Sequence, residues 1–256
     1  MRRRPFRFGA VDLPGVDWSE QARRLEDLGF DVLLLPDRPQ LPSALPALAA
    51  AAAVTTRLRV GTFVLAVARH ELEVVIRDFR TVSELSGGRF EPGLGAGIEG
   101  DAGADRLQRL TELAQATREA LPEARILIAA SGRRGLKLAA TMADTVPISL
   151  PPRATEAQVA ERIGWLLESA GERADEIELN LNLAAVGDAP TRWLSAMGIE
   201  PRDLQAAGSP MALWGNADDM CEQLERRREK LGVSYWSAPA GTAGLLAPVI
   251  ARLGGR

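Results

Sequence analysis

The chain has 256 residues, of which 46% are hydrophobic and 25% are charged, the balance expected of an ordinary globular protein. Its formal net charge at pH 7 is −3, so it lacks the basic surplus with which nucleic-acid-binding proteins neutralise phosphates. A single cysteine, Cys221, and a single histidine, His70, exclude an internal disulfide framework and come close to excluding a Cys/His zinc cluster. We therefore expect no metal site.

The sequence carries no signal for membrane insertion or export. The N-terminus is basic, but neither an apolar stretch nor a small-residue cleavage site follows it, so we expect no signal peptide. The longest apolar stretch, 44–54, is mostly alanine and is broken by Pro46, which makes it too short and too weakly apolar for a bilayer. We expect a cytoplasmic protein with no membrane partner.

Strand-like and helix-like segments alternate along the first half of the chain. The run 31–35 is uniformly apolar, as expected of a strand that is buried on both faces. The segment 18–28 follows Asp17, which can cap a helix, and stops at Gly29. The predicted elements are strand 7–13, helix 18–28, strand 31–35, helix 43–55, strand 58–65, helix 71–85, strand 89–95 and helix 104–121.

The second half repeats the same order. Its predicted elements are strand 126–130, helix 134–142, strand 145–150, helix 155–170, strand 177–186, helix 218–231, strand 233–236 and helix 242–253. The least regular stretch is 187–210, which contains three prolines and three glycines. We interpret this stretch as an excursion between the last units of the fold.

About eight strand-then-helix units in series predict an α/β fold with parallel strands and right-handed crossovers. Eight such units in about 250 residues match a (β/α)8 TIM barrel. The rival is an open doubly wound sheet, which usually has fewer units and a glycine fingerprint in its first turn. Leu13-Pro14-Gly15 does not match that fingerprint. No linker divides the chain, so we expect one barrel domain over 1–256.

In such a barrel the active site is built from the loops that follow the strands. The most informative loop is Ser131-Gly132-Arg133-Arg134, where a strand turns into a helix. The exposed amides and dipole of a helix start attract anions, and two arginines can add contacts to a phosphate. The alternative is a polar turn with solvated arginines.

Two other strand ends carry candidate groups. His70 is the one imidazole, so general acid–base work near neutral pH falls on it or on a carboxylate such as Asp37. His70 could equally be a surface residue, and Asp37 a helix cap. Gly93-Leu94-Gly95-Ala96-Gly97 is weak as a dinucleotide motif. It indicates close approach of the backbone to a flat ring or to a neighbouring strand, or else a plain tight turn.

Several stretches occur together in a specific order, and the chain resembles the luciferase-like monooxygenases, especially their deazaflavin-dependent branch. The likeness covers most of the chain. It is carried by 22–34, 56–65, 85–90, 93–97, 126–128 with 131–132, and 231–235.

The resemblance implies a luciferase-like barrel that binds a reduced flavin (FMN) or deazaflavin (coenzyme F-420) and acts on a small organic substrate by hydride transfer or oxygenation. It implies a homodimer, or a heterodimer with a related barrel. Asp37 and His70 are the implied catalytic groups. The implied cofactor-binding residues lie after strands two to five and are Arg38, Thr62, Val64, Leu65, Ala66, Gly95, Ala96, Gly97, Ala130, Ser131, Gly132, Arg133 and Arg134.

The sequence also departs from the family pattern. Alanines stand at Ala129 and Ala130, where the family has glycines, and Ile98 replaces a common aromatic. The stretch 97–106 leaves room only for a reduced insertion after strand four. A second hypothesis is therefore a luciferase-fold protein with a degenerate site and no cofactor, acting as a partner subunit, a ligand-binding protein or a cofactor-independent enzyme.

Overall fold

The computed structural model describes residues 3–97, 105–188 and 190–256, and its strands and helices alternate as expected. The strands are β1 (Arg7–Val11), β2 (Val32–Leu35), β3 (Arg59–Thr62), β4 (Leu65–Ala66), β5 (Phe90–Glu91), β6 (Gly93–Gly95), β7 (Leu127–Ala129), β8 (Thr145–Pro147), β9 (Glu178–Asn182), β10 (Ala185–Val186), β11 (Ala212–Leu213) and β12 (Tyr235–Pro239). The α-helices are α1 (Trp18–Asp27), α2 (Ala44–Ala53), α3 (Leu72–Leu85), α4 (Asp105–Ala120), α5 (Gly132–Met142), α6 (Glu156–Ala170), α7 (Arg192–Ala196), α8 (Pro201–Ala206), α9 (Ala217–Leu231) and α10 (Ala243–Leu253).

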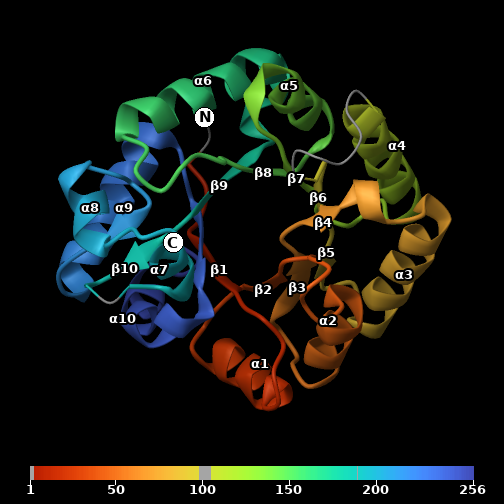
Figure 1. Cartoon of the computed structure of the whole chain (residues 1–256), viewed down its shortest axis with the longest axis horizontal. Helices are drawn as coiled ribbons and strands as arrows, with labels where there is room; N and C mark the ends of the chain where they lie inside the picture. The colour runs from red at the N-terminus through yellow and green to blue at the C-terminus, as the bar shows by residue number, and fades with distance from the viewer. Residues whose placement is uncertain (1–2, 98–104, 189) are drawn as a thin grey trace.

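Ten of the strands form one parallel sheet in the order β4-β6-β7-β8-β9-β12-β1-β2-β3-β5. Because β3 continues into β4 and β5 into β6, the pairings of β3 with β5 and of β4 with β6 close the sheet into a ring. The helices surround this ring (Figure 1). The predicted (β/α)8 barrel is confirmed.

The third and fourth strands of the barrel are both interrupted at the same level. A cis peptide joins Phe63 to Val64 between β3 and β4, and Pro92 separates β5 from β6. The hydroxyl of Thr62 donates to the carbonyl of Gly93 at 2.7 Å and accepts from the Gly93 amide at 2.9 Å. A Cβ atom on Gly93 would overlap the Thr62 carbonyl, so only glycine allows this close approach.

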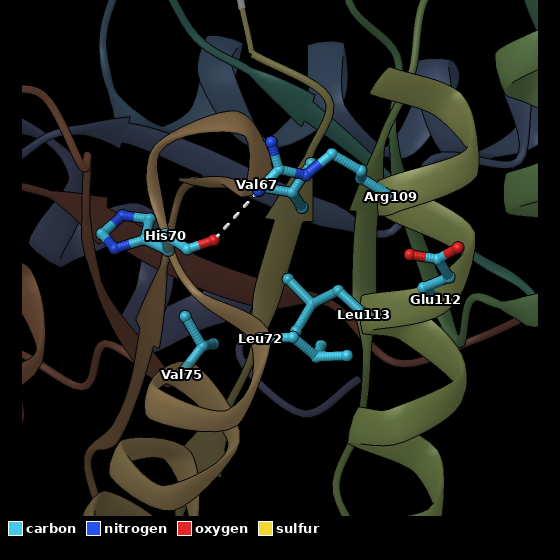
Figure 2. A pocket seen from close by; sticks show the side chains of 7 residues that line it. All are labelled: Val67, His70, Leu72, Val75, Arg109, Glu112 and Leu113. Carbon is cyan, nitrogen blue, oxygen red and sulfur yellow. Dashed lines mark hydrogen bonds between the residues drawn. The ribbon is translucent and has the colours of Figure 1, made fainter. Parts of the chain in front are cut away.

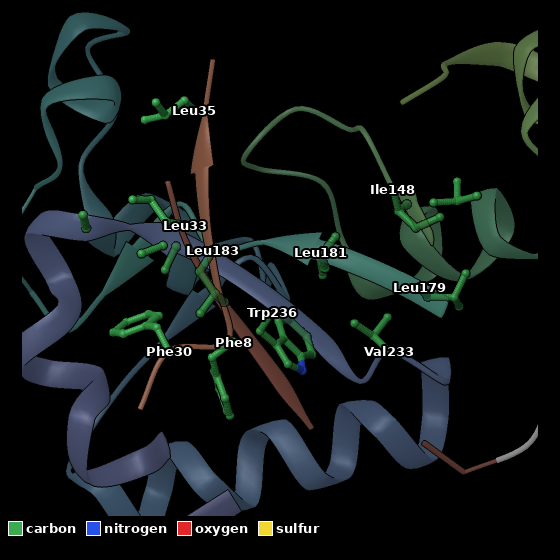
Figure 3. Packing of buried hydrophobic residues seen from close by; sticks show 14 of the residues in the cluster. Phe8, Phe30, Leu33, Leu35, Ile148, Leu179, Leu181, Leu183, Val233 and Trp236 are labelled. Atoms are coloured by element: carbon green, nitrogen blue, oxygen red, sulfur yellow. The ribbon is translucent and has the colours of Figure 1, made fainter. Parts of the chain in front are cut away.

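Alternate residues of each strand face the helices and form the main core. Figure 3 shows Phe8, Leu33 and Trp236 packed between the strands and the outer helices. The opposite faces line the inside of the barrel, where Tyr235 fills the space left open by Gly9. A side chain on Gly9 would come within 2.8 Å of the Tyr235 hydroxyl oxygen.

A group of buried charges closes the end of the barrel where the strands begin. Glu178 accepts from Arg7 at 2.6 Å and from Arg125 at 2.9 Å. Glu91 accepts from Arg7 at 2.7 Å and from Arg59 at 2.5 Å. Burial alone would lower the pKa of Arg7, but the charges of Glu91 and Glu178 raise it above its ordinary value. These five residues are called the basal ion cluster below.

The structure differs from the sequence expectations at two places in the second half. The segment expected as one strand over 177–186 breaks after Asn182, and β10 pairs with β11 in a separate two-stranded sheet. The stretch 187–210, expected to be irregular, contains α7 and α8. Thr191 caps α7 by accepting from the Leu194 amide at 3.3 Å, and Pro201 begins α8.

Candidate functional site

The wide end of the barrel, where the strands end, has an apolar bed on one side. Ala66, Gly95 and Ala129 lie side by side on neighbouring strands. On each of these strands the preceding residue, such as Leu65, points outward into the core between the strands and the helices. Because side chains alternate along a strand, these three residues face the interior of the barrel. Val64 covers Gly95, because a Cβ there would lie 2.5 Å from Val64 Cγ2. Across three strands the bed is about 10 Å wide, from the spacing of strands in a sheet.

An open helix start lies at one end of this bed. Two residues after Ala129, the exposed Ser131 occupies the cap position of α5, and its side chain makes no capping hydrogen bond. Gly132 follows with φ +73°, and no atom lies within 4 Å of where its Cβ would be. The first amides of α5 are therefore available to an anion.

The two arginines of this turn behave differently. Arg133 stacks on Trp165 of α6, with its guanidinium carbon 4.5 Å from the ring centre, and lies 4.0 Å from Glu168. Arg134 is exposed on the first turn of α5. Of the pair, Arg134 is therefore the cation that is left to meet a ligand at the helix start.

The position of α5 depends on Gly135. A Cβ on Gly135 would lie 2.9 Å from the Cβ of Ala130, so the helix rests directly on the strand end. We expect Gly135→Ala to lower the free energy of unfolding by about 1–3 kcal/mol, the usual cost of overpacking. Urea denaturation measures this change. Gly164→Ala on α6 is the control, because nothing lies within 4 Å of the added atom, and it should stabilise by about 0.5–1 kcal/mol. Equal stability of the Gly135→Ala variant and the unmodified protein would contradict this packing.

An acid–imidazole pair lies at the other end of the bed. The Nε2 atom of His70 is 2.7 Å from Oδ2 of Asp37, and the Ala66 amide donates to the same oxygen at 3.4 Å. Asp37 is half-buried and follows β2, while His70 follows the short helix η1 (Val67–Arg69). The sequence put these two residues 33 positions apart, and the fold brings them into contact.

The pKa of Asp37 gives a direct test of this contact. Burial alone would raise it, but the hydrogen bond and charge of His70 hold it below its ordinary value. Ionised Asp37 therefore adds stability above the unfolded-state pKa of about 3.9, and this is lost as the pH falls through the folded-state value. We expect His70→Gln to raise the midpoint in a carbon-13 NMR titration of the Asp37 carboxyl. An unchanged midpoint would show that His70 does not set it.

A small hollow lies behind His70, between α3 and α4. Figure 2 shows the ring of His70 turned away from it, while the His70 carbonyl accepts from Arg109 at 3.3 Å. The cavity measures about 40 Å³, which admits little more than one or two water molecules. It does not accommodate a flavin, so a ring would have to lie on the bed in the barrel mouth.

A polar wall crosses the barrel from the bed, on β9 and β12. Asn180 Nδ2 donates to Ser237 Oγ at 3.3 Å, and Ser237 Oγ lies 3.1 Å from Asn182 Oδ1. These contacts hold the Asn182 oxygen towards Ser237, and within the described ranges the Asn182 NH2 group donates no hydrogen bond. We did not single out Asn182 from the sequence, although the alternation of 178, 180 and 182 with leucines signals a polar inner face.

The remaining expected site residues contribute in other ways. Thr62 is fully buried and its hydroxyl is used by Gly93, so it shapes the barrel mouth without offering a polar group. Leu65 packs into the core, and Arg38 is exposed beyond Asp37. Ala96 and Gly97 are partly exposed after β6. Ile98 and most of the shortened insertion, 98–104, lie outside the described residues.

Among residues 3–97, 105–188 and 190–256, no three side chains of His, Cys, Asp or Glu gather closely enough to hold a metal ion. Within that same part of the chain, no helix has both the length and the apolar character needed to cross a bilayer.

The protein is thus a closed parallel (β/α)8 barrel, and its mouth carries an apolar bed, an open helix start and an acid–imidazole pair. The family model for luciferase-like monooxygenases matches residues 16–193, and the chain belongs to that family. Among proteins of curated function, none matches this sequence.

Solved structures share this fold over nearly the whole chain. The coenzyme F-420 dependent tetrahydromethanopterin reductase from Methanopyrus kandleri has a TM-score of 0.75 and 16% identity, with 97% of this chain and 99% of that chain covered. The monooxygenase RslO1 from Streptomyces bottropensis has a TM-score of 0.74 and 18% identity, with 96% and 99% covered. A riboflavin lyase, RcaE, solved with modified FMN and riboflavin, has a TM-score of 0.73 and 12% identity, with 98% and 94% covered. At such identities the likeness establishes the fold.

Proposed function

We propose that this protein is an oxidoreductase that holds FMN or coenzyme F-420 at the barrel mouth and acts on a small organic substrate. The observation that carries the proposal is the order of features along one edge of the barrel. The acid–imidazole pair touches Ala66, the bed runs through Gly95 to Ala129, and the open start of α5 follows. This order matches a flat ring with a phosphate at one end.

The residues present fit such a group. The bed is apolar and made of small residues, which suits the face of a ring, and Val64 would support it from below. The α5 amides and Arg134 would hold the phosphate. The methyl of Ala130 lies against Gly135, so this departure from the family pattern does not obstruct the phosphate. When bound, the reduced cofactor would supply the hydride or the oxygen chemistry.

The chain's own groups would orient the substrate and move a proton. Asp37 accepts a hydrogen bond from His70, which fixes the orientation of the imidazole ring. His70 is one-third exposed, so its ring can reach a substrate at the mouth. Across the barrel, the NH2 group of Asn182 would bind a substrate oxygen. A substrate with a carbonyl or another oxygen acceptor fits this pair of contacts.

Fluorescence titration tests the proposal with three ligands: coenzyme F-420, FMN and riboflavin. We expect F-420 or FMN to bind, and riboflavin to bind more weakly because it lacks the phosphate. Arg134→Glu should weaken the binding of the ligands that carry phosphate and leave the binding of riboflavin unchanged. Arg80→Glu, at an exposed position of α3, serves as a charge-matched control. Absence of binding by both cofactors would overturn the proposal.

Two observations favour a second candidate, a luciferase-fold protein that binds no cofactor. Arg133 is already engaged by Trp165, and the Ala129 methyl narrows the bed where the family has glycine. Such a protein would serve as a partner subunit or would bind a ligand directly. The same titration separates the two candidates.

A further inference from the structure

A second cavity lies outside the barrel wall, where residues of α8 and of the segment around β11 meet α6 and α9. It measures about 260 Å³, which is enough for a small organic molecule. Its lining residues come from α8, the segment into β11, α9 and the start of α6. They are Glu156, Gln205, Gly208, Ser209, Pro210, Trp214, Gln223, Arg226 and Arg227.

Arg227 is the unusual member of this lining, because it is 4% exposed. Its Nη2 donates to the Ala212 carbonyl at 2.8 Å and lies 3.4 Å from Gln223 Oε1. Its Nη1 is buried and has no hydrogen-bond partner among the described residues. The charge of Glu156 acts on it, but the Glu156 carboxylate forms its ion pair with Lys230 instead. The guanidinium carbon of Arg227 lies 5.9 Å from the centre of the Trp236 ring. A charge that is buried in this way without a direct ion pair is costly.

The charges that line the cavity also favour a negatively charged ligand. Burial and the charge of Arg226 lower the pKa of Arg227 to about 10, against the opposing charge of Glu156, so the guanidinium stays charged at neutral pH. Glu156 also lines the cavity, but its carboxylate is 3.1 Å from Lys230. The two lining arginines therefore outnumber the one lining carboxylate, and a negative ligand would supply the missing counter-charge.

We propose that this cavity binds a small organic carboxylate whose charge pairs with Arg227 and whose apolar body packs against Trp214 and Pro210. The carboxylate matches the planar guanidinium and relieves its unpaired burial. The exposed face of Trp214 offers apolar area that an inorganic anion cannot use. Glu156 on the same wall repels a second negative charge, which favours a monoanion over a dianion such as phosphate.

The test uses the full-length protein with benzoate, acetate and inorganic phosphate as probes, at matched ionic strength. We expect benzoate to raise the melting temperature by several degrees with saturation, and acetate and phosphate to do so less. Arg227→Met should abolish the benzoate effect. Arg252→Met is the control, since it also removes one positive charge but lies on the exposed side of α10 and should retain the effect.

A second measurement needs no change at Arg227. The indole N–H signal of Trp214, identified by its loss in Trp214→Phe, should move on adding benzoate to the unmodified protein. No saturable shift with benzoate in either experiment would overturn the proposal, as would an undiminished benzoate effect in a folded Arg227→Met variant. A larger effect of phosphate than of benzoate would overturn the assignment to a monocarboxylate.

Discussion

Gly95→Leu is expected to weaken binding of FMN or coenzyme F-420 by roughly 100-fold, a loss of about 2.7 kcal/mol. The first added atom would already lie 2.5 Å from Val64 Cγ2, so the new side chain can fit only by pushing Val64 into the barrel mouth. That displacement occupies the bed on which the ring would lie. Fluorescence titration of the deazaflavin or flavin measures the effect, and circular dichroism checks that the variant is folded.

Two further variants test whether the loss of cofactor affinity is caused by the change in the apolar bed. Leu94→Ile changes the neighbouring residue on the opposite face of β6, which packs into the core, and should leave the affinity unchanged. Ala129→Leu places a larger side chain at the partly exposed end of the bed and should weaken binding even if Gly95→Leu fails to fold. Unaltered affinity in folded Gly95→Leu and Ala129→Leu proteins would place the ring elsewhere.

Glu178→Gln should lower the free energy of unfolding by about 3–5 kcal/mol, which is the cost of removing one partner from a buried charge pair. The Glu178 side chain is 3% exposed and accepts from Arg7 and Arg125. Its loss leaves Arg7, which is largely buried, with Glu91 alone. The neutral amide keeps the size of the side chain, so the change isolates the charge. Guanidinium denaturation at pH 7 measures the difference.

Glu168→Gln provides the matched control for the basal ion cluster. Its side chain is 77% exposed and lies 4.0 Å from Arg133, so its removal should change stability by less than about 0.5 kcal/mol. The cluster lies at the barrel end where the strands begin, opposite the candidate site. Glu178→Gln should therefore leave cofactor affinity unchanged in the folded fraction. A stability loss below about 1 kcal/mol would show that water reaches the cluster and screens its charges.

Much of the fold could be predicted because it depends on local patterns. The alternation of apolar runs with capped amphipathic segments is written in neighbouring residues, and it specifies parallel strands, crossovers and the barrel. The open turn at Ser131 and Gly132 was predictable for the same reason, since a strand followed by a helix start is a local signal. The break after Asn182 was missed because the alternating segment 178–182 runs directly into the apolar segment 183–186, with no glycine or proline between them, and both patterns are typical of strands.

The sequence by itself determined the class of fold and the strand ends at which a site would lie, because both follow from periodicity along the chain. Only the tertiary structure decided which distant residues meet there. It joined Asp37 to His70, turned Thr62 and Leu65 away from the mouth, and buried Arg227 beside a cavity without a direct ion pair. Such contacts depend on strand register and on close packing between elements, and a shift of one residue reverses the face on which a side chain lies.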